Sequence, residues 1–384
     1  MCLRGYRRAE GRFGIRNHFV VLSSVCCANS FVEQIGVLDG NLIPIIHQHG
    51  CTHIGQDKEQ VLRTLAGVCN NPNVGGILLV GLGCESIGVD QIESAIDTEN
   101  KIVRHLIIQE MGRRDDVMGR ARAYIREMKA YLSNQALEEC DVSDLVVGLE
   151  CGGSDPFSGI TANPAVGLVS DRLVESGATV ILAETPELIG AEDALSERIQ
   201  QQDVKERLFS RINEYVKASR ECGCDMLGAN PTPGNIRSGL SSIEEKSLGC
   251  VAKGGRSFIQ EFVEYADRPK SKGLVMMDTP GNDPESVTGM VAGGAHVVLF
   301  TTGLGTPLGH PVAPVIKIAS NNKVFSNMND FMDITAGSVI DGEALSDVAD
   351  RIFELLIRVC NGEQTCSERN GCREFAMNRI GPTF

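Results

Sequence analysis

Short apolar segments that end in glycine or in small polar residues recur along the whole chain. Each is continuous rather than alternating and is rich in Val, Ile and Leu, which is typical of β-strands covered on both faces. The segments occupy residues 19–25, 42–47, 74–84, 144–151, 179–185, 273–281 and 296–303. Because such strands belong to parallel sheets with helices on both sides, this pattern strongly limits the folds that the chain can adopt.

Helical patterns separate these strands. Charged, amphipathic segments lie at residues 55–69, 117–137 and 192–221. Strands that alternate with helices predict an α/β fold of two mostly parallel-sheet, Rossmann-like domains with helices on both faces. We place these domains at residues 1–137 and 144–384, with a further division of the second near 270, because the segments between them have the polar composition of linkers.

The composition argues against several classes of protein. A net charge of −14 disfavours nucleic acid and anionic membranes as partners. No apolar run approaches the roughly 18 residues that a membrane span needs. The basic N-terminus is not followed by the apolar stretch of a signal peptide, so we expect a cytoplasmic protein. In that compartment thiols stay reduced, so the 14 cysteines predict no disulfide framework.

Unusual polar motifs follow five of the predicted strands. Ligands of open parallel sheets bind at the carboxyl ends of the strands, so five such motifs predict a binding site. The motifs are Cys84–Glu85, Cys151–Asp155, Glu184–Glu187, Asn282–Asp283 and Thr301–Pro307. The carboxylates of Glu85, Asp155 and Glu187 suit an acid, a base or a metal ligand, and suit the capping of a helix N-terminus equally well.

Candidate metal ligands are spread along the chain, and none forms a local zinc pattern such as CxxC. The segment HQHGCTH (47–53) crowds three imidazoles and a thiol after a strand, and His47 and His49 point the same way on an extended chain. Fe(II) or Zn(II) would accept these ligands. A polar turn explains the segment equally well, and any single cysteine is most often a small core residue.

The function of the glycine-rich turns and of the helix that carries Lys246 stays open. The turns GLGCESIG and TTGLGTPLGHP match neither the dinucleotide fingerprint nor the P-loop, which disfavours nucleotide binding. Lys246 lies in SSIEEKSLGC (241–250), a helix with an N-terminal cap. A lysine in that place is usually solvated, but a desolvated one acts as a general base or holds a carboxylate.

The chain resembles the large catalytic part of the altronate dehydratase and D-galactarate dehydratase family. The matching segments follow one another from end to end of the chain. They are GYRRAEGRFGIRN, HQHGC, NPNVGGILLVGLGCE, GLECGGSDPFSGITANPAVG, NPTPGN, EEKSLGC, TPGND, GTPLG, IKIASN and NGEQTCSERN. The resemblance implies an iron-dependent lyase that removes water from a sugar acid, altronate-like or galactarate-like, and yields a 2-keto-3-deoxy acid. A related large subunit acts on sulfolactate and expels sulfite instead.

The resemblance also implies roles for individual residues. At the metal it implies His47, Cys84 and Cys151, followed by Cys27 and Cys51, with Fe(II), another divalent metal, or an iron–sulfur cluster held by three of the thiolates. For the substrate pocket it implies Gly152, Gly153, Ser154, Asp155, Thr161 and Asn163, with Asn282, Thr302 and Thr306 on the hydroxyls. His47, Glu85 and Lys246 are the catalytic candidates, and Lys246 is either the base or the group that holds the substrate carboxylate.

The chain departs from the family pattern in three places. It begins almost at GYRR, without the small β-clip (SAF-type) domain, so a separate small subunit of that type is an expected partner. Leu304 stands where the family has an arginine, and Ile236, followed by Arg237, where it has a lysine. A smaller or less charged acid is one reading of these changes, and an inactive or partner-dependent subunit is another. We expect a homodimer, the commonest symmetric state.

Overall fold

The computed structural model describes residues 2–223 and 230–384. Its largest sheet has seven parallel strands in the order β10-β11-β9-β8-β12-β13-β14. These strands are β8 (Val146–Cys151), β9 (Thr179–Leu182), β10 (Ile259–Val263), β11 (Gly273–Met277), β12 (Val297–Thr302), β13 (Val315–Ala319) and β14 (Ile334–Thr335). Helices make the connections from β8 to β9, β9 to β10, β11 to β12 and β13 to β14, which confirms the predicted α/β architecture.

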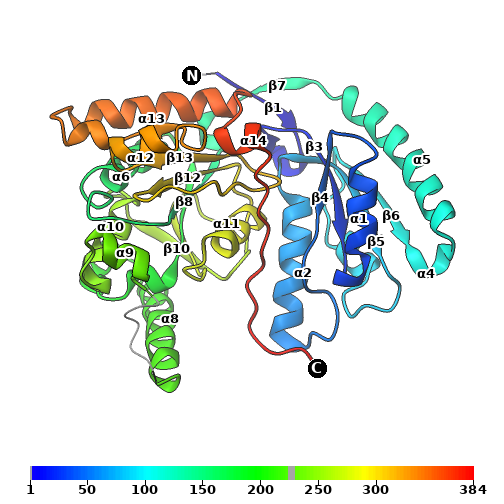
Figure 1. Cartoon of the computed structure of the whole chain (residues 1–384), viewed down its shortest axis with the longest axis horizontal. Helices are drawn as coiled ribbons and strands as arrows, with labels where there is room; N and C mark the ends of the chain where they lie inside the picture. The colour runs from blue at the N-terminus through cyan, green and yellow to red at the C-terminus, as the bar shows by residue number, and fades with distance from the viewer. Residues whose placement is uncertain (1, 224–229) are drawn as a thin grey trace.

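The N-terminal part of the chain builds a second parallel sheet, in the order β4-β3-β5-β6. Its strands are β3 (His18–Ser23), β4 (Leu42–Ile45), β5 (Val74–Gly81) and β6 (Ile102–Ile107). All eight residues of β5 are buried, as the continuous apolar run predicts for a central strand. The two parallel sheets occupy opposite halves of the molecule (Figure 1).

A small antiparallel sheet joins these halves. It has the order β2-β1-β7 and consists of β1 (Leu3–Arg7), β2 (Phe13–Gly14) and β7 (Leu137–Cys140). The segment 138–144, expected as a linker, therefore contributes an edge strand, followed by a short 3-10 turn at Val142–Asp144. The residues of β7 are exposed or only partly buried, so the strand has no apolar run by which the sequence could reveal it. The division into domains stays a prediction, and the strands on both sides of residue 270 belong to the same seven-stranded sheet.

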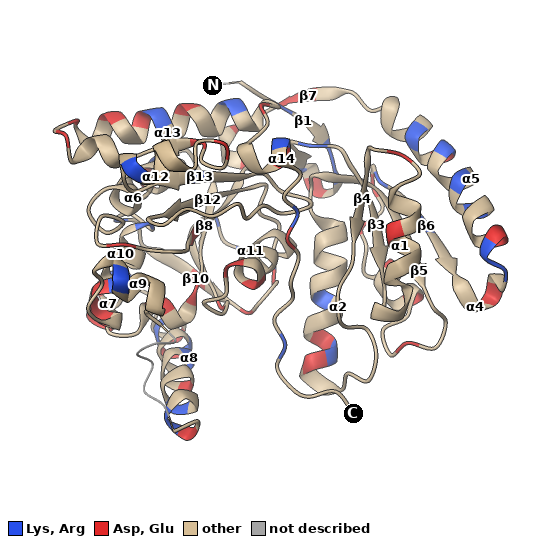
Figure 2. Ribbon diagram, in the orientation of Figure 1, with Lys and Arg blue, Asp and Glu red and all other residues tan. Residues whose placement is uncertain are grey.

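Helices cover the faces of both parallel sheets (Figure 1). They are α1 (Asn29–Gly36), α2 (Gly55–Asn70), α3 (Val89–Ser94), α4 (Ile108–Met111), α5 (Arg114–Ser133), α6 (Ala162–Glu175), α7 (Glu192–Ser196), α8 (Gln202–Glu221), α9 (Pro233–Ser238), α10 (Ile243–Ala252), α11 (Asp283–Ala292), α12 (Asn322–Asn327), α13 (Leu345–Cys360) and α14 (Cys366–Asn370). Charged side chains gather on the outer helices α5, α8 and α13, whereas the strands carry few of them (Figure 2).

The predicted helix at 192–221 is divided in the structure. It forms α7 and α8 with a break at residues 197–201. At the break, the carbonyl of Arg198 accepts a hydrogen bond from the Ile259 backbone N–H at 2.8 Å, and the Arg198 guanidinium donates to the Gly254 carbonyl at 2.7 Å. The first bond occupies the Arg198 carbonyl, which in a continuous helix would accept the backbone N–H four residues later. This long-range pairing therefore outweighs the local helical pattern.

One hydrophobic core is shared by the two parallel sheets. Ile77 and Leu79 of β5 belong to the same buried cluster as Val298 and Phe300 of β12, together with residues of α2 and α11. Helices α2 and α11 lie between the sheets in backbone contact, and a Cβ added at Gly67 would stand 2.6 Å from the Ala292 carbonyl oxygen. The outer faces of the sheets have cores of their own. The shared core fixes how the two sheets face each other.

The C-terminal segment after α14 returns to the N-terminal half. It runs past α2 in Figure 1. The buried Asp57 of α2 accepts hydrogen bonds from the Ile380 backbone N–H at 3.0 Å and from the Arg379 guanidinium at 3.1 Å, and it pairs with the buried His53 ring at 2.6 Å. Asp57 is therefore the main polar anchor of this segment. Among the described residues, no helix has both the length and the apolar character needed to cross a bilayer.

Replacing Asp57 by Asn is expected to loosen the C-terminal segment. The change removes a charged acceptor of several buried donors, which costs about 1–3 kcal/mol of unfolding free energy. Limited proteolysis should then cut near residues 375–384 faster than in the parent, and urea unfolding should report the loss. Asp115→Asn is the matched control, because that carboxylate is 98% exposed. Equal rates of proteolysis and equal stability in the two variants would contradict the anchoring role of Asp57.

The same carboxylate predicts a pH dependence. Burial raises the pKa of Asp57, but hydrogen bonds from His53, the Ile380 N–H and Arg379 outweigh it and lower the pKa to about 2. Its contribution to stability is thus complete above the unfolded pKa of about 3.9 and is lost as the pH falls towards 2. The difference in unfolding free energy between the parent and Asp57→Asn should shrink over that interval.

Candidate functional site

Four of the five polar strand ends meet at one edge of the seven-stranded sheet. They follow β8, β9, β11 and β12, which are neighbours in the order β11-β9-β8-β12. The fifth motif, Cys84–Glu85, follows β5 of the other sheet. Since the carboxyl ends of parallel strands share an edge, four of the motifs lie together as expected, and the fifth belongs to the other sheet.

A compact group of thiols and carboxylates lies buried at this edge. The ligand atoms of Cys151, Glu184, Glu187 and Cys250 all lie within 4.8 Å of one another. Cys151 ends β8, the two glutamates follow β9, and Cys250 comes from α10. Each of the four is buried, so the group is shielded from water and its electrostatic interactions are strong.

Helix α10 brings three of the polar side chains to this group. The helix begins at Ile243, and the hydroxyl of the preceding Ser242 caps it by accepting the Glu245 backbone N–H at 3.2 Å. From there Lys246, Cys250 and Lys253 follow at spacings of four and three residues, which places them on one face of a helix. That face packs against the short 3-10 helix Thr185–Leu188, which carries Glu187.

Two buried ion pairs bind α10 to the loop after β9. The Lys253 ammonium contacts Glu184 Oε2 at 2.6 Å, and both side chains are fully buried. The Lys246 ammonium pairs with Glu187 Oε1 and donates to Asn230 Oδ1 at 2.7 Å. Glu184 Oε2 also accepts the Cys151 backbone N–H at 3.0 Å, and the Cys151 thiol donates to Glu187 Oε2 at 3.3 Å.

A second group of carboxylates adjoins the first. Oxygens of Glu150, Glu184 and Asp283 lie within 4.8 Å of one another. Ser286 of α11 donates to Glu150 Oε2 at 2.7 Å. The other oxygens of Glu150 and Glu184 are buried without any hydrogen-bond partner. Buried acceptors without partners are unusual and indicate a place for a cation or another donor.

The pKa values show a surplus of negative charge. Burial and the nearby Glu184 raise the pKa of Glu150 and of Glu187, and they raise that of Asp283 to about 7. A hydrogen bond with Cys250, together with burial, raises the pKa of the Cys151 thiol. The cause is that two ammoniums face four carboxyl groups and two thiols in a water-poor space.

This donor set fits a metal ion. A divalent cation would balance the two carboxylates in excess of the two lysines, and it would take up the unpartnered oxygens of Glu150 and Glu184. Two thiolates with carboxylates suit a borderline metal. Binding would displace the protons that the raised pKa values retain on Cys151 and Glu187. The buried cluster of Cys and Glu side chains is therefore able to hold a metal.

The backbone around the cluster is unusual in two places. Glu184 has a left-handed conformation with φ +70° and ψ +61°, which is uncommon for a residue other than glycine or asparagine. Its backbone N–H donates to Thr279 Oγ1 at 2.7 Å. A Cβ added at Gly152 would lie 2.1 Å from Asp283 Oδ2, so only glycine fits there. Strain and close approach of this kind often mark functional sites.

The predicted loop GLECGGSD lies at the cluster, and its residues differ in their hydrogen bonding. Gly153 has φ +60°, and its carbonyl accepts the Leu304 backbone N–H at 2.9 Å. The Asp155 carboxylate is occupied by Ser158, Ser320 and Asn321. The Ser154 hydroxyl is buried and has no partner, so it is free to meet a ligand.

The other predicted substrate residues hold the surrounding loops. Asn163 donates to the Gly249 carbonyl at 2.9 Å and accepts the Thr301 hydroxyl at 2.6 Å. Thr161 donates to a backbone carbonyl of residue 157 or 320. Thr302, Thr306 and Asn282 accept backbone N–H groups in their own turns. Each is near the carboxyl edge of the sheet, and its contact with substrate stays a prediction.

A cavity of about 300 Å³ opens beside the cluster. Lys246 lines it together with Ser154, Asn163 and Leu240. The volume is at the lower end of small-molecule pockets, about 300 Å³. Lys246 therefore belongs both to the cavity and, through Glu187, to the group of possible metal ligands.

His47 lies in the other half of the molecule, just after β4. It is buried, and both ring nitrogens are engaged: Nε2 donates to the Ser23 carbonyl at 2.7 Å, and Nδ1 accepts the His49 backbone N–H at 3.1 Å. Burial lowers its pKa to about 4, so the ring is neutral. In this arrangement neither nitrogen is free for a metal.

The remaining predicted ligands are exposed at the carboxyl edge of the smaller sheet. Cys27, Cys51 and Cys84 are exposed thiols, and Gln109 donates to the Cys84 sulfur at 3.6 Å. Glu85 accepts the Ser24 hydroxyl at 2.6 Å and the Gly83 backbone N–H at 2.6 Å, so it organises its own loop. Within the described ranges, neither group of close ligand atoms includes any of these residues or His47.

Comparison with known proteins covers both halves of the chain. Residues 142–383 match the family described as "D-galactarate/Altronate dehydratase, C-terminal", and residues 5–133 match "D-galactarate dehydratase/Altronate hydrolase, second domain". The chain belongs to the D-galactarate/altronate dehydratase family. The named dehydratases of this family are hydro-lyases.

Relatives with assigned names agree with this placement. An altronate dehydratase of Escherichia coli is 34% identical over 391 residues, which cover 99% of this chain and 78% of that protein. A galactarate dehydratase (L-threo-forming) of the same organism is 35% identical, covering 94% of this chain and 73% of that protein. The (2R)-sulfolactate sulfo-lyase subunit beta of Chromohalobacter salexigens is 35% identical, covering 98% and 97%.

The sequence contained signals for cluster residues that were not selected as site residues. Cys250 and Lys253 extend the helical spacing that begins at Lys246, so the pattern KxxxCxxK on one helix face was available. Glu184 and Glu187 lie in a strand-end motif, and Glu187 there suits an acid, a base or a metal ligand, but the set of metal ligands that the resemblance implies includes neither. Glu150 had no such signal, because it sits inside an apolar strand where a buried carboxylate is rare.

Replacing Lys253 by Met is expected to destabilise this member of the dehydratase family strongly. The change leaves Glu184 buried without its counter-charge, which costs about 3–5 kcal/mol. Urea unfolding of metal-free protein measures the loss, and the double variant Lys253→Met/Glu184→Gln should recover part of it. Lys217→Met is the control, because the Lys217–Glu221 pair is exposed and a surface pair contributes about 0–1 kcal/mol. Similar losses in both single variants would contradict the buried pairing.

Proposed function

We propose that the protein is a metal-dependent hydro-lyase that dehydrates a sugar acid to a 2-keto-3-deoxy acid. The observation that carries the proposal is the buried group of Cys151, Glu184, Glu187 and Cys250, beside a cavity lined by Lys246. The family membership supports the reaction class. A substrate of this class carries a carboxylate and several hydroxyls, which suits a pocket with an ammonium and a free serine hydroxyl.

The metal that we propose is a single Fe(II) ion. Two thiols and two carboxylates can surround one ion of borderline softness, whereas a cluster held by three thiolates would need a further cysteine in the group. Another divalent metal is the alternative. When bound, the ion would stabilise the negative charge that develops on substrate oxygens, by several kcal/mol.

Lys246 is proposed to hold the substrate carboxylate rather than to remove a proton. Burial lowers its pKa, but the charges of Glu187 and Cys151 outweigh this and raise it above the usual value, so the side chain is an ammonium at neutral pH. An ammonium donates hydrogen bonds and cannot accept a proton. Glu187, which contacts Lys246 and has a raised pKa, is the better candidate for the base that takes the proton next to the carboxylate. In that role it would leave the ion to Cys151, Glu184 and Cys250.

The leaving group separates the main proposal from its alternative. A sulfo-lyase would break a carbon–sulfur bond after the same proton removal and release sulfite instead of water. The similarity to the sulfolactate sulfo-lyase subunit, at 35% identity, supports this reaction as the alternative. Leu304, which replaces a family arginine, lies against the substrate loop, 3.3 Å from an added Gly153 Cβ. An apolar group there favours a smaller or less charged acid.

One anaerobic assay tests the proposal. The reduced protein, supplied with ferrous iron, is offered altronate, galactarate, other aldonates and sulfolactate, and 2-keto acid and sulfite are measured together. Keto acid without sulfite is the expected result. Sulfite release would establish the sulfo-lyase reaction instead. No product from any substrate would contradict catalysis by this chain alone and would favour a partner-dependent or inactive subunit.

Thiol variants locate the metal. Cys151→Ser and Cys250→Ser should each lower iron content and abolish turnover, because each removes a buried ligand. Cys84→Ser is the matched comparison, because it removes an exposed thiol of the smaller sheet. Metal analysis and the keto-acid assay measure both effects. Loss of iron in Cys84→Ser, with Cys151→Ser unchanged, would transfer the metal to the N-terminal group of His47, Cys27, Cys51 and Cys84.

The assembly of the protein stays a prediction. We propose a homodimer, with a small β-clip (SAF-type) subunit as a further partner. Light scattering of the purified protein and copurification with a small protein test both proposals. A monomer that is fully active alone would contradict both.

A further inference from the structure

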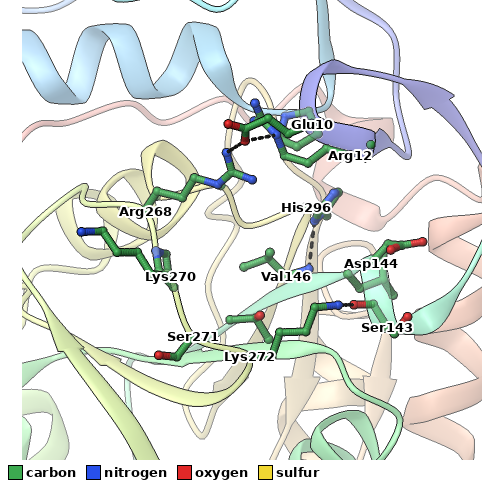
Figure 3. A pocket seen from close by; sticks show the side chains of 17 residues that line it. Glu10, Arg12, Ser143, Asp144, Val146, Arg268, Lys270, Ser271, Lys272 and His296 are labelled. Atoms are coloured by element: carbon green, nitrogen blue, oxygen red, sulfur yellow. Dashed lines mark hydrogen bonds and ion pairs between the residues drawn. The ribbon is translucent and has the colours of Figure 1, made fainter.

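A second pocket lies at the opposite edge of the seven-stranded sheet. It has a volume of about 350 Å³ and is lined by the starts of β8, β9 and β11, the turn before β12, and residues 10–12 of the N-terminal half. Figure 3 shows these segments surrounding one space. Val146 lines the pocket and Cys151 lies five residues further along β8, so the two sites are roughly 17 Å apart, at about 3.3 Å per residue.

The side chains of this pocket carry a positive charge. Arg12, Arg268, Lys270 and Lys272 line it, against the two carboxylates of Glu10 and Asp144. The excess of two positive charges is notable in a chain whose net charge is −14. A local cationic concavity on an acidic protein attracts small anions selectively.

Two guanidiniums share a single carboxylate at one side of the pocket. Arg268 Nη1 lies 2.9 Å from Glu10 Oε2, and Arg12 Nε lies 3.6 Å from the same oxygen (Figure 3). Arg12 has a second acidic neighbour, Asp97, at 3.4 Å. Burial and then the charge of Arg268 lower the pKa of Arg12, which shows that the two cations repel each other. An added anion would relieve this repulsion.

The other side of the pocket offers donors that are free to bind. Among the residues that the structure describes, the exposed Lys270 ammonium has no hydrogen bond and no ion pair within 4.0 Å, and Figure 3 draws it without a contact. Lys272 donates to the Ser143 carbonyl, which leaves two of its three protons. The hydroxyls of Ser271 and Thr179 also line the space.

The back wall of the pocket is neutral. His296 is buried, and its ring is fixed by the Val146 backbone N–H at 3.0 Å and the Phe13 carbonyl at 2.8 Å. Burial lowers its pKa to about 4, so the ring carries no charge at neutral pH. Both nitrogens are engaged, so the ring shapes the pocket but leaves recognition to the cations.

We propose that this pocket binds a small anion with carboxylate or phosphoryl groups, through Arg12, Arg268, Lys270 and Lys272. Guanidinium and ammonium groups make charge-assisted hydrogen bonds to both kinds of oxyanion. The bound anion links residues 10–12 of the N-terminal half to the loop 268–272 of the other half. The site is separate from the proposed catalytic cluster and does not rest on the proposed reaction.

Titration calorimetry of the full-length protein tests the site, with inorganic phosphate as the phosphoryl probe and malonate as the carboxylate probe. At least one of them should bind with a stoichiometry near one, and more weakly at higher salt. Arg268→Ala/Lys270→Ala should weaken that binding about tenfold or more, because it removes two charged donors. The probe that binds more tightly identifies the oxyanion that the pocket prefers.

Two variants show where the probe binds. Lys217→Ala/Arg220→Ala removes the same charge from the exposed end of α8 and should leave the affinity unchanged. Lys246→Met removes the ammonium of the catalytic cavity and should also leave it unchanged. Absence of binding by both probes, or equal affinity in the parent and Arg268→Ala/Lys270→Ala, would overturn the proposal. Weakening in Lys246→Met alone would assign the bound anion to the catalytic cavity instead.

Discussion

Glu184 ties the candidate site together. Its carboxylate receives the Lys253 ammonium from α10 and the Cys151 backbone N–H from β8, while its own N–H reaches Thr279 after β11. Three neighbouring strand ends and a helix thus depend on one buried acid. Desolvating this ion pair costs several kcal/mol, so a pair of apolar residues would serve stability at least as well. Its presence is better explained by a requirement for negative charge at this place.

That requirement explains the composition of the surroundings. Acids outnumber the lysines, two carboxylate oxygens have no partner, and the backbone of Glu184 is held in the left-handed region. Each feature is unfavourable in a protein core by itself. Together they fit a place that holds a cation, in keeping with the metal-dependent reaction that we propose.

The sequence predicted the fold well where burial was complete and less well where it was partial. Continuous apolar runs identified β3, β4, β5, β8, β9, β11 and β12. They did not identify the edge strands β6 and β10, whose partly exposed residues interrupt the run. Strand β13 was missed because Lys317 stands in its middle, buried and bound to the Leu308 carbonyl at 2.9 Å. No local pattern shows that a lysine will find carbonyl partners in the folded state.

The residues of the candidate site could also be predicted only in part. Cys151, Lys246 and Glu187 stood out beside strand ends or in motifs, and they meet in the structure. His47 and Cys84 stood out equally, yet they belong to the other sheet, because sequence shows that a residue ends a strand but not which sheet the strand joins.

The contact between α2 and α11 has a consequence for access to the cluster. With Gly67 against the Ala292 carbonyl and a common apolar core between the sheets, pivoting one sheet away from the other would expose that whole core to water. Such a motion costs far more than rearranging a surface loop. The passage of the proposed substrate and metal ion to Glu184 therefore depends on the loops at the carboxyl edge of the large sheet, and the rest of the molecule serves as a fixed frame.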